Sequence, residues 1–94
     1  MIHILPGGLS LWHVLLERDM RREVFTMERD VAEVGDRLEI TEGRLPRAYY
    51  YTAEPAVAMS GNFSAQNRIR SASGVIVEKV RHESSFLITM EFDE

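Results

Sequence analysis

Short runs of β-forming residues recur along the chain, and in several of them apolar and polar positions alternate, as in strands with one buried face. We expect five or six short strands, drawn from six ranges: 22–27, 37–42, 49–52, 56–59, 75–80 and 86–92. Residues 81–85 join the last two as a predicted hairpin. This succession of short strands is typical of a small barrel or a strongly curled sheet.

The first residues follow a different pattern. Ile2 to Leu5 form a short apolar run that ends at Pro6, which predicts a first strand or an extended lead-in. Four apolar residues then recur at helical spacing: Leu11, Trp12, Leu15 and Leu16. With Ser10 as the N-cap, these positions predict a helix over about residues 9–18. We therefore expect an α+β fold in which one N-terminal helix caps the barrel.

Loops are predicted where turn-forming residues cluster. Residues 43–48 read as a loop, and residues 60–67, which are rich in Ser, Asn and Gly, read as a second loop that we expect to be mobile. The chain of 94 residues has the length of one domain, so we expect a single domain over 1–94.

Charge and composition exclude some classes of function. The net charge is −4, which argues against a protein that coats nucleic acid non-specifically but leaves room for a local basic groove. The chain has no cysteine, which excludes disulfides, thiolate catalysis and cysteine-ligated zinc. The apolar start lacks a basic leader and an uninterrupted run of about 20 apolar residues. We therefore expect a soluble cytoplasmic protein.

No sequence motif indicates a cofactor or a metal ion. The three histidines, His3, His13 and His82, are scattered along the chain and form no zinc-binding pattern. Glycine-rich phosphate-binding motifs and a nucleophile elbow are also missing from the sequence. We expect neither a metal site nor a cofactor.

Five segments of the first half occur in the order seen in a known family: 3–6, 14–16, 21–25, 29–31 and 34–42. The most specific part is the Arg-Asp pair that leads into Val-Gly-Asp and an alternating strand ending in glutamate. In this order the chain resembles the ASCH domains of the PUA-like superfamily, in particular the small members found in phages and bacteria. The resemblance implies a PUA/ASCH-like barrel with a cleft between the helix and the barrel.

The same resemblance bears on activity. Some ASCH-like proteins are small amidohydrolases or ribonucleases that depend on a lysine, and the position of that lysine holds Met20 here. The family's glutamate is kept as Glu23, whereas Phe25 stands at its arginine position. In a shifted register Arg21 or Arg22 takes the place of the lysine, but the pKa of arginine is too high for a general base. We therefore expect a binding protein more than an enzyme, with Glu23 as the catalytic base if catalysis is retained.

Charged residues near the strand predicted at 22–27 form the first candidate site: Arg21, Arg22, Glu23 and Arg29. Arginines in this place can hold a phosphate through two hydrogen bonds, and a glutamate can accept a hydrogen bond from a base. The alternative is a solvated turn whose charges pair with the acidic residues beside them.

Arginines and tyrosines are interleaved in a second candidate site. Arg44 and Arg47 precede three consecutive tyrosines, Tyr49 to Tyr51, and such a mixture can stack bases and hold phosphates. In a strand Tyr49 and Tyr51 face one side and Tyr50 the other. We take Arg47 and Tyr50 as the binding candidates, and the alternative is that one set of tyrosines belongs to the core.

A third candidate site lies in the later half of the chain. Arg68 and Arg70 share a face if their segment is extended, and Lys79 and Arg81 add further positive charge. This arrangement is either the positive wall of a groove or a solvated face.

These candidates leave three hypotheses open. The first is a module that binds RNA, a modified base or a nucleotide in the cleft between helix and barrel. The second is a small nucleoside amidohydrolase or ribonuclease of the ASCH type. The third is a phage-type interaction or inhibitor protein whose acidic charge lets it bind a basic protein partner.

Overall fold

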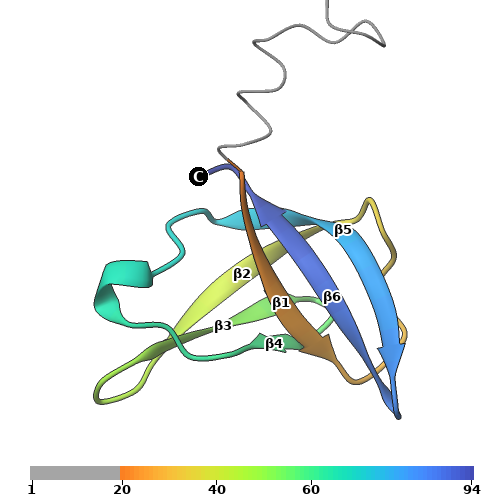
Figure 1. Cartoon of the computed structure of the whole chain (residues 1–94), viewed down its shortest axis with the longest axis horizontal. Coiled ribbons are helices and arrows are strands. Elements are labelled where there is room, and N and C mark those ends of the chain that lie inside the picture. The colour runs from red at the N-terminus through yellow and green to blue at the C-terminus, as the bar shows by residue number, and fades with distance from the viewer. Residues whose placement is uncertain (1–19) are drawn as a thin grey trace, which may run out of the picture.

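Six antiparallel strands close into a barrel in the computed structural model, which describes residues 20–94 (Figure 1). The strands are β1 (Arg21–Met27), β2 (Arg37–Arg44), β3 (Tyr49–Glu54), β4 (Ala58–Ser60), β5 (Ser73–His82) and β6 (Ser85–Phe92). Their order around the barrel is β1-β4-β3-β2-β5-β6, and β6 returns to pair with β1 along the whole of β1, from Arg21↔Phe92 to Met27↔Phe86. The barrel predicted from the sequence is confirmed.

Each of the six predicted strands is present, with its bounds shifted by a few residues. The hairpin between the last two is also confirmed, with His82 paired to Ser85. One loop prediction is wrong in part, because β2 continues through Gly43 and Arg44. The Tyr50 ring covers Gly43 from the paired strand, and this contact favours continued pairing where the sequence suggests a turn.

The described part of the chain has no α-helix, and its one helical turn is the 3-10 helix η1 (Ala65–Asn67). The helix predicted over residues 9–18 and the strand predicted over 2–5 lie outside the described residues. No helix within residues 20–94 is long and apolar enough to cross a membrane.

Alternation along the strands fills the interior of the barrel with large side chains. The largest of these are fully buried: Tyr51, Phe25, Phe92, Met27, Ile76, Ile88 and Met90. A small barrel has room inside only for side chains, so this packing leaves no channel along the axis. Apolar burial at about 25 cal/mol per Å² makes this core the main source of stability.

One end of the barrel is spanned by residues 61–72, which lead from β4 to β5 and are called here the crossover segment. This segment includes most of the predicted 60–67 loop. It is tied to the barrel by paired backbone hydrogen bonds of 2.8 Å between Phe63 and Tyr49, and by a 2.9 Å bond from the Ile40 N–H to the Ala72 carbonyl. Ile69, 5% exposed, enters the core from this side. The crossover segment therefore closes the end of the barrel at which β1 begins and β6 ends.

Gly74 allows β5 to approach β6 closely. A Cβ atom at this position would lie 2.6 Å from Cε1 of Phe92 and 2.9 Å from the Glu91 carbonyl oxygen. Phe92 is fully buried and cannot move aside without disturbing the core. The glycine is thus required by packing.

We predict that Gly74→Ala lowers the free energy of unfolding by about 1–3 kcal/mol, because the methyl group overpacks the core against Phe92. Gly61→Ala is the matched control, since a Cβ at Gly61 meets nothing within 4 Å. Urea denaturation of the two variants checks the prediction. Equal stabilities for both variants would contradict it.

Candidate functional site

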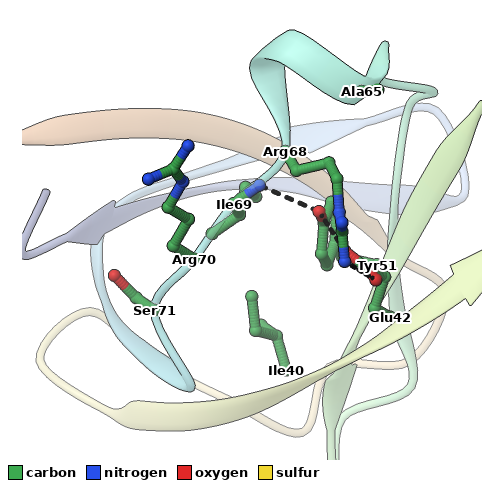
Figure 2. A pocket seen from close by; sticks show the side chains of 8 residues that line it. All are labelled: Ile40, Glu42, Tyr51, Ala65, Arg68, Ile69, Arg70 and Ser71. Atoms are coloured by element: carbon green, nitrogen blue, oxygen red, sulfur yellow. Dashed lines mark hydrogen bonds and ion pairs between the residues drawn. The ribbon is translucent and has the colours of Figure 1, made fainter.

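A pocket of about 510 Å³ lies at the crossover end, between β2, β3 and the crossover segment (Figure 2). It is lined by Ile40, Glu42, Tyr51, Ala65, Arg68, Ile69, Arg70 and Ser71. Ligand sites for small molecules commonly enclose about 300–1,000 Å³, so the pocket has the size of such a site.

Glu42 lies on the inner-facing side of β2 because it follows Leu38 and Ile40 at intervals of two residues. Arg68 binds its carboxylate with two hydrogen bonds, one of 2.6 Å from Nη2 to Oε1 and one of 3.0 Å from Nε to Oε2. The guanidinium carbon of Arg68 also lies 4.3 Å from the centre of the Tyr49 ring. A bidentate pair combined with cation–π stacking holds Arg68 in one orientation.

Tyr51 connects this ion pair to the core. Its ring is buried at 1% exposure, and its hydroxyl donates to Oε2 of Glu42 at 2.7 Å. The same hydroxyl accepts a 2.8 Å hydrogen bond from the backbone N–H of Ile69 (Figure 2). One phenol oxygen thus joins β2, β3 and the crossover segment.

The network fixes the charges at the pocket wall. Arg68, and then Tyr51, hold the pKa of the Glu42 carboxyl below its ordinary value. Burial, and then the hydrogen bond to Glu42, raise the pKa of the Tyr51 hydroxyl. Glu42 in turn raises the pKa of Arg68. At neutral pH the wall therefore carries an ionised carboxylate, a neutral phenol and a charged guanidinium.

Arg70 lies across the pocket from this network, with Ser71 beside it and Ile40 at the base (Figure 2). Within residues 20–94 the Arg70 guanidinium forms no ion pair. Because Arg68 is neutralised by Glu42, Arg70 supplies the net positive charge of the pocket wall.

Arg21 and Glu23 lie next to the pocket without lining it. Nε of Arg21 donates to the Glu23 carboxylate at 2.7 Å, and its Nη1 donates to the Arg68 carbonyl at 2.9 Å. Arg21 therefore positions the crossover segment. Glu23, the residue considered as a catalytic base, is paired with Arg21 and lies outside the pocket lining.

The structure distributes the other predicted site residues over separate surfaces. Arg22 lies on the outer face of β1 and pairs with Glu91 at 2.9 Å. Arg29 is exposed after the opposite end of β1, and Arg47 is exposed in the turn between β2 and β3. Tyr50 faces the outside of β3. Of the predicted residues, only Arg68 and Arg70 line the pocket.

Sequence reasoning missed Glu42, Tyr51, Ile40 and Ser71 as members of one site. Two signals were present in the sequence. Glu42 continues the inward alternation of Leu38 and Ile40, which places a carboxylate on the buried side of a strand. Tyr51 was predicted to share a face with Tyr49, and its burial agrees with the alternative in which one of the two sets of tyrosines belongs to the core.

The described residues contain no group of three or more His, Cys, Asp or Glu side chains that would hold a metal ion. Comparison of the chain with models of protein families, with curated proteins and with solved structures found no match. The function must therefore be inferred from the pocket itself.

We predict that Tyr51→Phe lowers the free energy of unfolding by about 1–3 kcal/mol, because the buried Ile69 N–H loses its acceptor. Tyr50→Phe is the matched control: the Tyr50 hydroxyl makes no hydrogen bond within the described residues, so we expect a change below about 0.5 kcal/mol. Chemical denaturation measures both. A Tyr51→Phe variant as stable as Tyr50→Phe would show that the network contributes nothing.

We also predict a pH-dependent contribution from Glu42. A carboxyl whose pKa is lowered on folding stabilises the protein above its ordinary value of 4.5, and this stabilisation is lost as the pH falls through the folded-state pKa. Glu42→Gln should therefore be less stable than the wild type at pH 7, and the difference should shrink towards pH 3. The exposed Glu39→Gln, on the outer face of β2, is the control. A difference for Glu42→Gln that stays constant with pH would contradict the prediction.

Proposed function

We propose that the chain is a binding module for RNA or a nucleotide, and that the ligand occupies the pocket at the crossover end of the barrel. The observation that carries the proposal is the placement of Arg70, with no ion pair among the described residues, across a pocket from the fixed Glu42–Arg68 pair. A site for a nucleotide needs a cation for the phosphate and an apolar surface with nearby polar groups for the base.

The pocket wall offers each of these parts. Ile40 and Ala65 supply apolar contact for a base. Ser71 and Glu42 supply polar groups for the base edge, where an ionised carboxylate accepts hydrogen bonds from ring or amino N–H groups. Arg70 reaches the phosphate. The pocket therefore fits one nucleotide, either free or within a single strand of RNA.

Charge sets the strength that we expect for this binding. The chain carries −4 overall, and the pocket contributes one cation beyond its internal pair. Because few phosphates are neutralised, binding should be modest in affinity and should depend only shallowly on salt. Such binding is typical of a selective site for one nucleotide rather than of a surface that coats RNA.

The proposal keeps the resemblance to PUA/ASCH-like proteins, and the six-stranded barrel supports it at the level of a small β-barrel. It places the ligand at the crossover segment, whereas the resemblance implied a site in the cleft beside the predicted helix. The hydrolase and the protein-interaction hypotheses stay predictions. The pocket does not support the hydrolase hypothesis, because Glu23 does not line it. It does not support the protein-interaction hypothesis, because its wall suits a small ligand.

Titration of the protein with ribonucleosides, their 5′-monophosphates and short single-stranded RNA tests the proposal. We predict saturable binding at low salt, weakened roughly tenfold by Arg70→Ala, because a charge-assisted contact to phosphate is lost. Arg47→Ala is the matched control: it removes the same charge in the β2–β3 turn, away from the pocket.

Two outcomes would overturn the proposal. One is the absence of binding to all of these probes at low salt. The other is an equal loss of affinity in Arg70→Ala and Arg47→Ala, since general electrostatic attraction would then explain the binding.

A further inference from the structure

The side chain of Glu94 occupies a position next to the pocket that is built to hold an anion. The backbone N–H of Arg70 lies 3.0 Å from both carboxylate oxygens of Glu94. Nη1 of Arg21 lies 3.6 Å from Oε1 of the same carboxylate. We call this pair of donors, the Arg70 N–H and the Arg21 guanidinium, the anion seat.

The cation of the seat is held rigidly before any ligand arrives. Arg21 is fixed by Glu23 through its Nε, by the Arg68 carbonyl through Nη1 and by the Asn67 carbonyl through Nη2. Its guanidinium carbon also lies 5.5 Å from the centre of the Phe63 ring. Little conformational entropy is lost when such a group binds an anion.

Among residues 20–94, the contacts that hold the Glu94 side chain are those of the seat. After β6 its backbone N–H donates to the Phe92 carbonyl at 2.8 Å, and this turn directs its side chain back towards Arg70. The carboxylate stays partly exposed, with 19% of the side chain accessible. An anion from solution can therefore compete with it for the seat.

A count of charges at this end of the barrel supports such competition. Three arginines, Arg21, Arg68 and Arg70, lie with three glutamates, Glu23, Glu42 and Glu94. Glu23 and Glu42 each form a short ion pair with an arginine, at 2.7 and 2.6 Å. The contact of Glu94 with Arg21 is the longest of the three, so Glu94 is the carboxylate that a ligand replaces most easily.

We propose that the anion seat is the phosphate subsite of the nucleotide pocket, and that Glu94 occupies it as an internal competitor until a phosphate displaces it. The inference rests on the proposed function, because Arg70 belongs to both the pocket and the seat. One phosphate oxygen accepts the Arg70 N–H and pairs with Arg21 as the Glu94 carboxylate does, a second oxygen pairs with the Arg70 guanidinium, and the displaced carboxylate turns to solvent.

The test compares Glu94→Ala with the wild type, using each ribonucleoside and its 5′-monophosphate as probes at low salt. Removal of the competitor should tighten binding of the monophosphate roughly tenfold and leave binding of the nucleoside unchanged. Glu91→Ala is the control, because it changes the net charge equally but lies on the outer face, where it pairs with Arg22. It should not produce this selective gain.

A second measurement keeps the seat testable by itself. Inorganic phosphate titrated into Glu94→Ala should shift the backbone amide resonance of Arg70 with saturation, and should shift it far less in the wild type. If nucleosides and nucleotides fail to bind while phosphate still saturates the seat, the proposed function is wrong and the anion seat stands.

The proposal for the seat is overturned by either of two results. One is a monophosphate affinity that Glu94→Ala leaves unchanged although the nucleotide binds the pocket. The other is an Arg70 amide that does not respond to phosphate in Glu94→Ala.

Discussion

The end of this barrel depends on a hydrogen bond between the Tyr51 hydroxyl and the backbone N–H of Ile69. Through it, a strand and a segment far apart in the sequence share one buried oxygen, and the single proton of that hydroxyl is donated to Glu42. Glu42 can then hold Arg68, and Arg68 leaves Arg70 as the cation across the pocket. The geometry of the pocket thus follows from satisfying one buried N–H group, which is costly to leave without a partner.

The proposed function requires the crossover end of an acidic protein to attract an anion. Each arginine beside the pocket has a distinct role: Arg68 is paired with Glu42, Arg21 donates to two backbone carbonyls, and Arg70 is exposed. The overall charge of −4 therefore says little about this site. Local balance, rather than the total, decides which ligand the surface attracts, because screening limits charges to a range of about 10 Å.

The strands could be predicted from the sequence because alternation is a local property of the chain. The same property indicated that Tyr49 and Tyr51 share one face, and that Arg68 and Arg70 share one if their segment is extended. The closure of the barrel, by contrast, depends on which strands become neighbours. No local sequence pattern predicts that the crossover segment contacts both Tyr49 and Arg21. Glu42 was missed as a site residue for this reason, since its partner Arg68 reaches it only in the closed barrel.

The pairing of β1 with β6 has a kinetic consequence. The first and last described strands, β1 and β6, pair with each other. The β1–β6 and β5–β6 ladders are the longest of the barrel. The barrel therefore closes only when the two ends of the described region meet. Folding dominated by such distant contacts is slow, on the order of milliseconds to seconds. Arg21 lies at the start of β1, and Glu94 lies just after the end of β6. The two residues come together only at that step. Because the Arg21 end of β1 pairs with β6 and not with β4, the proposed anion seat of Arg21 and the Arg70 N–H is assembled only after β6 has been synthesised.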